Sequence, residues 1–317
     1  MEDLKIFSGS THPELGERIC RDLGVPPGRA ELIEFSNENL FVRILENVRD
    51  CVVFAVQPFS SPVQRSVMEF LIMLDALRRA GAKKIVAVIP YYGYGRSDKK
   101  DQPHVPITAR LLADLITAAG ASHILTVDLH SPQIQGFFNI PVDEISGFPL
   151  LRDYYRERRE ELGDLVVVAP DLGAAKRARN FASSLDAPLA VIEKMREGNV
   201  ESAKALSLFG EVRGKTALLV DDEVNTGGSL IAAAHLLLEK GAREVRACCV
   251  HPILSKDAPR RIDESPIKEL VVTDTVPVPE EKRGSKIKVM TIAPLLAEAI
   301  RRIYRGLPVE EENGHFR

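Results

Sequence analysis

The chain has 317 residues, of which 45% are hydrophobic and 27% charged, and its formal net charge is -3. This length exceeds the usual size of one domain and predicts two cores of roughly 150 residues each. The composition is typical of a soluble globular protein and argues against a disordered chain or a protein that coats nucleic acid. We therefore expect no nucleic-acid partner.

Short β-branched runs alternate along the chain with helix-length amphipathic segments. The predicted strands are 51–56, 84–89, 123–128 and 165–170, and the predicted helices are 66–81, 108–120 and 229–241. Each of these helices ends in Gly followed by Ala, and a buried strand comes next, which is a recurring α/β pattern. Fully apolar strands indicate sheets covered by helices on both faces. We predict an α/β fold with two similar halves.

The boundary between the halves is expected near "ISGFPLL" (145–151), where Gly and Pro interrupt the pattern. A charged helix, "RDYYRERREEL", is expected to follow. This places one domain at 1–147, a second at 148–305, and a polar tail at 306–317 that we expect to fray.

The cysteines and the apolar stretches indicate the compartment. The four cysteines show no metal-ligand spacing, and the adjacent pair, Cys248 and Cys249, is poorly placed to bridge to itself. The N-terminal "MEDLKIF" lacks the basic and apolar regions of a signal peptide, and no apolar stretch of about 18 residues occurs. We expect a cytoplasmic protein with no membrane partner.

The stretch "LLVDDEVNTGGSL" (218–230) joins an apolar strand, an acidic pair and a glycine turn that opens a helix. The N–H groups of residues 227–229, with the neighbouring Thr and Ser hydroxyls, would surround a phosphate at the positive end of the helix dipole. Asp221 and Asp222 would repel that phosphate, but they suit vicinal hydroxyls one ribose length away. An isolated acidic pair is more often only a helix cap, but the full pattern predicts a ribose phosphate site.

This stretch resembles the ribose 5-phosphate loop shared by phosphoribosyltransferases and ribose-phosphate pyrophosphokinases. Further segments are similar to the pyrophosphokinases alone, and these segments lie at 5–19, 35–39, 92–100, 126–145, 169–178 and 193–196. Among them, "DLHSPQIQGFF" is highly specific to that family. The resemblance implies two phosphoribosyltransferase-type domains, each a mostly parallel sheet covered by helices on both faces. It also implies the reaction, in which the diphosphoryl group of ATP moves to the anomeric hydroxyl of ribose 5-phosphate and AMP is released.

The resemblance assigns the residues for the sugar and for catalysis. Lys194 and Arg196 would stabilise the charge that develops in the transition state, and they lie two apart on an expected strand, on the same face. The residues implied for ribose 5-phosphate are Arg196, Asp221, Asp222, Asn225, Thr226, Gly227, Gly228 and Ser229.

For ATP, the resemblance implies a hairpin near "FSNEN", in which Phe35 would pack on the adenine. The residues implied for ATP are Phe35, Asn37, Glu38, Asn39, Arg96, Ser97, Asp98, Lys99, Lys100 and His130. Asn39 and Ser97 differ from the family's common acidic residue and Gln, so the nucleotide preference stays open, because an amide both donates and accepts. The loop with Lys99 and Lys100 either closes over the phosphates or is an ordinary solvated loop.

A Mg²⁺ cofactor is implied, with His130 and Asp171 as the metal residues. Both follow predicted strands at their carboxyl ends, where α/β sheets place ligands, and a carboxylate oxygen suits Mg²⁺. Without the resemblance, a lone His at this place is more often a structural hydrogen-bonding residue.

The family's regulatory site, where phosphate activates and ADP inhibits, is built partly from serines. In the family's Ser-x-Arg segment this chain keeps Arg49 but has Asn47 in place of the serine. Its tail carries Glu310, Glu311 and Glu312, which would repel phosphate. We expect activity without inorganic phosphate, and a homo-oligomer that is either a dimer or a hexamer.

Two other functions remain possible. A phosphoribosyltransferase would share the ribose loop but would not need Lys194, Arg196 or His130. A non-catalytic regulatory member of the family would be expected to lose the metal and diphosphoryl contacts, which this sequence keeps. The segment "GEVRGKT" (210–216) has three residues between its glycines instead of the four of a P-loop and precedes its strand, so we predict a turn there.

Overall fold

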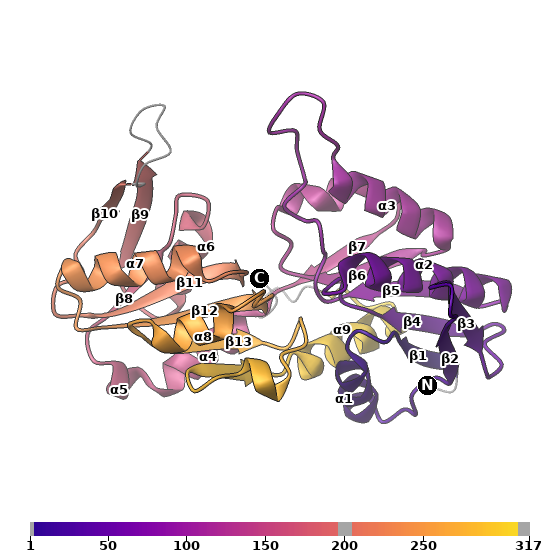
Figure 1. The fold of residues 1–317 in the computed structure, drawn as a ribbon. Coiled ribbons are helices and arrows are strands. Elements are labelled where there is room, and N and C mark those ends of the chain that lie inside the picture. The colour runs from indigo at the N-terminus through magenta and orange to yellow at the C-terminus, as the bar shows by residue number, and fades with distance from the viewer. Residues whose placement is uncertain (1–2, 196–204, 310–317) are drawn as a thin grey trace. The chain divides into compact units, whose positions relative to one another are not determined.

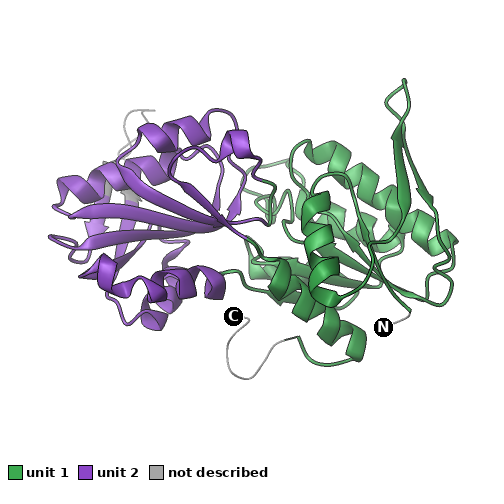
Figure 2. Cartoon of the chain, turned by 90° about the horizontal axis from the view of Figure 1, so that it is seen from below, with its two compact units in different colours: residues 1–147, 275–277, 291–317 green, residues 148–274, 278–290 purple. Residues whose placement is uncertain are grey.

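The computed structural model describes residues 3–195 and 205–309. Two compact units divide the chain (Figure 2): unit 1 comprises Met1–Gly147, Thr275–Pro277 and Thr291–Arg317, and unit 2 comprises Phe148–Asp274 and Val278–Met290. The first change of unit falls after Gly147, where the sequence places the domain boundary. The segment from Thr291 differs from the expectation, because it groups with unit 1 and not with the second half.

Unit 1 consists of β1 (Leu4–Ser8), α1 (Pro13–Leu23), β2 (Ala30–Glu34), β3 (Leu40–Ile44), β4 (Val52–Val56), α2 (Val63–Arg79), β5 (Lys84–Ile89), α3 (Thr108–Ala119), β6 (His123–Val127), η1 (Pro132–Phe137), β7 (Val142–Ile145) and α9 (Ala293–Arg305). Its parallel sheet has the order β1-β4-β5-β6-β7 (Figure 1), and β2 and β3 form a separate antiparallel hairpin. The strands and helices predicted in this half are confirmed as β4, β5, β6, α2 and α3.

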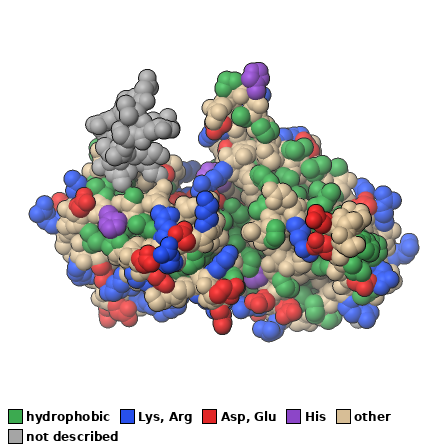
Figure 3. Space-filling model, viewed as in Figure 1, with side chains coloured by type: hydrophobic (Ala, Val, Ile, Leu, Met, Phe, Trp, Pro, Cys, Tyr) green, Lys and Arg blue, Asp and Glu red, His purple; other side chains and the backbone are tan. Residues whose placement is uncertain are grey.

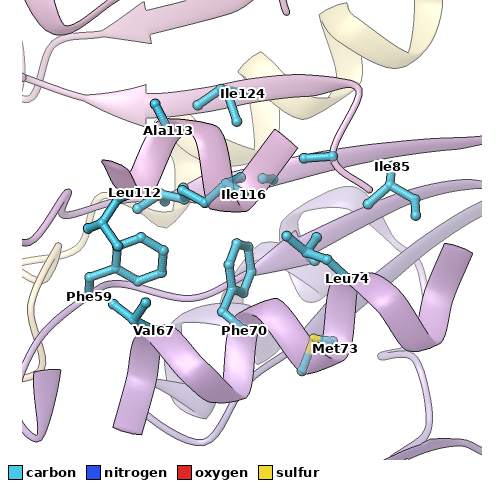
Figure 4. Packing of buried hydrophobic residues seen from close by; sticks show 14 of the residues in the cluster. Phe59, Val67, Phe70, Met73, Leu74, Ile85, Leu112, Ala113, Ile116 and Ile124 are labelled. Carbon is cyan, nitrogen blue, oxygen red and sulfur yellow. The ribbon is translucent and has the colours of Figure 1, made fainter. Parts of the chain in front are cut away.

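The core of unit 1 lies between the sheet and the helices α2 and α3. Side chains alternate between the two faces of a strand, so apolar strands supply two layers. On this face Ile85 and Ile124 pack under the apolar sides of α2 and α3 (Figure 4). The rings of Phe59 and Phe70 meet edge to face with their centroids 5.5 Å apart. This layer fixes the carboxyl ends of β4, β5 and β6.

The opposite face of the unit 1 sheet is covered by α1 and α9. Leu296 and Ile300 of α9 are fully buried, and Arg301 donates to the carbonyl of Asp22 at 3.2 Å. This apolar contact with α1 is the reason that α9 belongs to unit 1 although it follows unit 2 in the chain.

The first residues of the C-terminal tail also pack on the fold. Gly306 ends α9 in the left-handed conformation, and Arg302 then donates to the carbonyl of Pro308 at 2.7 Å. Val309 is only 4% exposed. The expectation that the tail frays from Gly306 is therefore wrong for residues 306–309, and residues 310–317 lie outside the described residues.

Unit 2 consists of α4 (Phe148–Glu157), α5 (Arg159–Leu162), β8 (Leu165–Ala169), α6 (Ala175–Ser184), β9 (Leu189–Met195), β10 (Ala205–Phe209), β11 (Thr216–Val224), α7 (Gly228–Glu239), β12 (Glu244–Pro252), α8 (Ala258–Glu264), β13 (Ile267–Thr273), η2 (Glu280–Lys282) and β14 (Ile287–Met290). The sheet order is β10-β9-β8-β11-β12-β13-β14, and all neighbours are parallel except β9 and β10. The predicted strand 165–170 and helix 229–241 are confirmed as β8 and α7.

Helices cover both faces of the unit 2 sheet. α7 and α8 pack on one face through Leu230, Leu237 and Ile262, and α6 packs against β8 and β11. The charged helix predicted from Arg152 begins earlier and breaks at Arg158, because Phe148 packs edge to face on Phe181 of α6 and starts the helix there. Residues 210–215 of this segment form the predicted turn, and β11 begins at Thr216.

Basic and acidic side chains are interspersed over the face shown in Figure 3, in agreement with the small net charge. Within residues 3–195 and 205–309, no helix is long and apolar enough to cross a membrane.

Candidate active site

Three neighbouring strands of unit 2 bring predicted site residues to the same edge of the sheet. Leu219 of β11 pairs with Val168 of β8, and Ala169 of β8 pairs with Val191 of β9. Asp222 lies three residues after Leu219 on β11, Lys194 lies three residues after Val191 on β9, and Asp171 follows the end of β8 by two residues. Because β8, β9 and β11 are parallel, all three residues lie toward the carboxyl edge of the sheet.

The structure describes only part of the predicted catalytic pair. Lys194 lies in β9, where its backbone is paired with Leu206 of β10. Arg196 lies outside the described residues. The prediction that their side chains share one face therefore stays a prediction.

The strand before the ribose loop is longer than the sequence indicates. β11 does not end at the acidic pair but continues to Val224, because Glu223 and Val224 still pair with His251 and Pro252 of β12. On the other side, the pairing with β8 stops at Leu219. Asp221 and Asp222 thus lie where β11 no longer pairs with β8, so backbone groups on that side of the strand are not used by this ladder.

The two acids have different surroundings. Arg177 of α6 places its guanidinium 3.3 Å from Asp222 Oδ1, and the side chains are 25% and 7% exposed, respectively. Asp221 Oδ1 accepts the N–H of Asp222 at 2.9 Å. Burial raises the pKa of the Asp221 carboxyl well above its ordinary value, and the neighbouring Asp222 carboxyl raises it further. The pair therefore combines a carboxylate neutralised by Arg177 with a carboxyl group that tends to keep its proton.

The turn after β11 has the backbone of an anion site. Gly227 adopts the left-handed conformation, with φ of 72°, and α7 begins at Gly228. The first N–H groups of a helix have no intrahelical acceptor, and successive N–H groups in such a turn form a concave anion site. Thr226 and Ser229 flank these glycines and are exposed. The predicted phosphate-binding residues thus lie together in one tight turn.

The connection between β12 and α8 holds this turn. Ser255 donates its N–H to the carbonyl of Asn225 at 3.1 Å and its hydroxyl to the Asn225 side-chain oxygen. Arg261 donates from Nη1 to the carbonyl of Thr226 at 3.0 Å. Sequence reasoning missed Arg177, Ser255 and Arg261, because each acts on the site from another part of the chain. A basic residue in the first turn of the helix after Asp171 is the only local signal, and it concerns Arg177.

In unit 1, the predicted adenine residues close the hairpin of β2 and β3. Phe35 donates its N–H to the carbonyl of Asn39 at 2.9 Å, and Glu38 has φ of 65° in the turn between them. Asn37 accepts the N–H of Asn39 on its side-chain oxygen at 3.3 Å. The Phe35 side chain is 50% exposed, and its ring lies 6.0 Å from that of Phe41. The hairpin therefore presents an aromatic ring on its surface.

The other predicted ATP residues of unit 1 follow β5 and β6, which are neighbours in the sheet. A Cβ placed on Gly95 would lie 3.5 Å from Cβ of His130, so His130 packs directly beside the residue that precedes Arg96. The segment from Arg96 to Lys100 continues as a loop, in which Arg96, Lys99 and Lys100 are exposed and Ser97 and Asp98 are half-buried. The fold thus brings His130 and the start of this loop together.

Two acids that sequence reasoning missed fix the turn carrying His130. Asp128 accepts the Ser146 hydroxyl at 2.8 Å and the N–H of Gly147 at 2.6 Å. Glu144 accepts the N–H of Leu129 at 2.7 Å. These bonds connect the end of β6 to the end of β7 and hold the backbone that leads into His130.

The two predicted metal residues, Asp171 and His130, each follow the carboxyl end of a strand. Asp171 follows β8 and accepts the N–H of Ala174 on Oδ1 at 3.1 Å, which positions its carboxylate at the start of α6. His130 is exposed at the carboxyl edge of unit 1. Among the residues that the structure describes, no three His, Cys, Asp or Glu side chains form a metal-binding group. Mg²⁺ usually keeps waters and binds substrate phosphates, so it does not require such a group.

Known proteins resemble this chain over nearly its whole length. The model of the N-terminal domain of ribose phosphate pyrophosphokinase matches residues 4–120, and that of the phosphoribosyl synthetase-associated domain matches residues 194–311. A ribose-phosphate pyrophosphokinase of Caldanaerobacter subterraneus subsp. tengcongensis is 52% identical over 310 residues, which are 97% of each chain, and one of Clostridium acetobutylicum is 49% identical over 98% of this chain and 97% of that one.

A solved structure shows the same fold. The crystal structure of phosphoribosylpyrophosphate synthetase from Mycobacterium smegmatis has a TM-score of 0.91 and 42% sequence identity, and the match covers 96% of this chain and 99% of that one. The predicted α/β fold with two phosphoribosyltransferase-type domains is therefore confirmed. The chain belongs to the ribose-phosphate pyrophosphokinase family.

Proposed function

We propose that this chain transfers the β,γ-diphosphoryl group of ATP to the anomeric hydroxyl of ribose 5-phosphate, giving phosphoribosyl pyrophosphate and AMP. The observation that carries the proposal is the carboxyl edge of the unit 2 sheet. There an acidic pair, at the point where β11 no longer pairs with β8, precedes an anion-binding turn by a few residues, which suits a phosphorylated sugar.

Ribose 5-phosphate binds at this edge with its phosphate in the turn 226–229 and its ring hydroxyls at Asp221 and Asp222. Arg177 neutralises one carboxylate, so the acidic pair can lie close to a phosphorylated sugar at a reduced electrostatic cost. A protonated Asp221 can donate to a sugar hydroxyl while Asp222 accepts from another. Asn225 also contributes to this site, and Ser255 holds both its backbone carbonyl and its side-chain oxygen in place.

ATP is held by unit 1, with the adenine packed on the exposed Phe35 and its edge read by Asn37 and Asn39. The loop of Arg96 to Lys100 and His130 contribute to binding its phosphates. Lys194 and Arg196 supply cations that stabilise the charge developing on the transferred group.

Mg²⁺ is the proposed cofactor, and Asp171 and His130 are the residues that would contact it or its waters. When bound, the ion neutralises negative charge on the polyphosphate. In the chain itself, the Asp171 carboxylate is oriented by the N–H of Ala174.

The test is a coupled assay for AMP release from ATP and ribose 5-phosphate in the presence of Mg²⁺. We expect AMP to appear only when the sugar phosphate is present. No AMP above the control without sugar would contradict the proposal and favour a non-catalytic regulatory role in the same family.

We also propose that the chain forms a homo-oligomer, a dimer or a hexamer, in the cytoplasm. Leu111 and Leu115, four residues apart on α3, are 53% and 41% exposed and present apolar surface to a partner copy. All four cysteines are free and buried, as suits a reducing compartment. Light scattering coupled to size-exclusion chromatography measures the assembly, and a monomer at micromolar concentration would contradict it.

A further inference from the structure

The turn proposed to bind the sugar phosphate packs against the segment that runs from the end of β12 through α8, residues 253–264. Leu254 donates its N–H to the carbonyl of Val224 at 3.1 Å. Ile262 lies under the turn, where a Cβ placed on Gly227 would be 3.5 Å from its Cγ1. Together with the bonds of Ser255, these contacts support the chain from Val224 to Gly227.

Arg261 is the charged member of this support. Its Nη1 donates to the carbonyl of Thr226 at 3.0 Å, and its Nη2 lies 3.6 Å from the position of a Cβ on Gly228. In the described part of the chain, this is the only hydrogen bond of the Arg261 side chain, and no carboxylate forms an ion pair with it. The neighbouring Arg260, in contrast, pairs with Asp257 and Glu264 on the surface of α8.

The bond from Arg261 determines where the next N–H group points. The peptide between Thr226 and Gly227 is trans, since the only cis peptide among the described residues is Ser61–Pro62. In a planar trans peptide the carbonyl and the N–H point in opposite directions. Because Arg261 holds the Thr226 carbonyl toward α8, the N–H of Gly227 is directed away from α8, toward the opposite side of the turn.

We propose that Arg261 is a positioning residue for ribose 5-phosphate, which directs the N–H of Gly227 toward the sugar phosphate by holding the Thr226 carbonyl. This inference depends on the proposed function of the turn. The guanidinium also keeps a positive charge beside the turn, with no ion pair to a carboxylate of residues 3–195 or 205–309, and this charge favours a phosphate dianion there.

The hydrogen bond to the Thr226 carbonyl and the positive charge can be tested separately. Arg261→Lys keeps the charge and one donor group but loses the planar fork, whereas Arg261→Gln keeps donor groups and loses the charge. Arg260→Gln is the matched control, because Arg260 is the adjacent residue of the same helix and does not contact the turn.

Steady-state kinetics with each substrate varied in turn tests the proposal. Arg261→Gln is expected to raise the Michaelis constant for ribose 5-phosphate about tenfold or more, as loss of a charge-assisted hydrogen bond does, and to leave that for ATP within about twofold. Arg261→Lys should recover part of this loss. In Arg261→Ala, added guanidinium ion should replace part of the missing side chain and lower the Michaelis constant for ribose 5-phosphate. Sodium chloride at the same concentration should not have this effect.

Thermal unfolding of each variant shows whether the protein still folds. An unchanged Michaelis constant for ribose 5-phosphate in Arg261→Gln, or an equal rise for both substrates, would overturn the proposal, as would the same change in Arg260→Gln. If the unsubstituted protein releases no AMP, the proposed function fails, and calorimetric binding of ribose 5-phosphate to the same variants then decides the role of Arg261 independently.

Discussion

Removing Arg177 should destabilise unit 2 and weaken binding of the sugar, because it leaves the Asp222 carboxylate without its cation. The charged atoms lie 3.3 Å apart. At an effective dielectric constant of about 20, two unit charges at this distance attract by about 5 kcal/mol. The Asp222 side chain is 7% exposed and that of Arg177 is 25% exposed, so water screens part of this attraction. We expect Arg177→Gln to lower the free energy of unfolding by about 2 kcal/mol, below the 3 to 5 kcal/mol typical of a fully buried pair.

A double-mutant cycle isolates the ion pair from the other contacts of Arg177. The guanidinium also lies 5.6 Å from the centre of the Phe148 ring, and Arg177→Gln loses this cation–π contact as well. Urea unfolding of Arg177→Gln, Asp222→Asn and the double variant gives the coupling between the two charges, which we expect to be about 1 to 2 kcal/mol. Arg179→Gln, in the same helix and exposed, should change stability by less than about 0.5 kcal/mol.

The same variants test the role of the pair in the site. Because the Arg177 guanidinium no longer balances the Asp222 charge, the Michaelis constant for ribose 5-phosphate should rise about tenfold in Arg177→Gln, while that for ATP changes little. If the coupling energy is near zero and Arg177→Gln is no less stable than Arg179→Gln, the ion pair does not contribute in solution and the reasoning is refuted.

Lys194→Ala should lower turnover by about 10² or more with little loss of stability, because its cation acts mainly in the transition state, and a variant that keeps over half the turnover would remove Lys194 from catalysis. Asn225→Asp should fold normally, since a carboxylate can also accept from Ser255, and should not improve the Michaelis constant for ribose 5-phosphate; a severalfold improvement would contradict the electrostatic account of the turn. The raised pKa of Asp221 means that the folded state keeps a proton that the unfolded state releases, so this carboxyl costs stability as pH rises above its ordinary value of 3.8. Asp221→Asn should therefore gain stability relative to the unsubstituted protein, by at least about 1 kcal/mol, between about pH 5 and pH 8 in thermal unfolding, and a gain that does not grow with pH would oppose this. Initial rates at fixed ionic strength should not depend on inorganic phosphate, and saturable activation of severalfold would reveal a phosphate site.

The sequence by itself determined the features that depend on neighbouring residues. The apolar runs of β4, β5 and β8 are unambiguous because a strand buried on both faces needs nearly continuous apolar side chains. The turn at 226–229 is equally local, since Gly227 takes a left-handed conformation that other residues adopt only at a cost. These patterns were sufficient to predict the two-part α/β fold and the tight glycine turn at 226–229.

Only the tertiary structure decided which distant residues support the site. Arg261 reaches Thr226 from 35 residues further along the chain, and Arg177 meets Asp222 across the space between α6 and β11. The grouping of α9 with unit 1 depends likewise on an apolar face whose partner, α1, lies at the other end of the sequence. Apart from the basic first turn of the helix that carries Arg177, no local pattern marks such residues, because a lone arginine or an amphipathic helix has the same sequence signature whether it faces solvent or a partner. Their roles arise from the packing of the sheets and helices, which brings side chains from separate segments to a single edge.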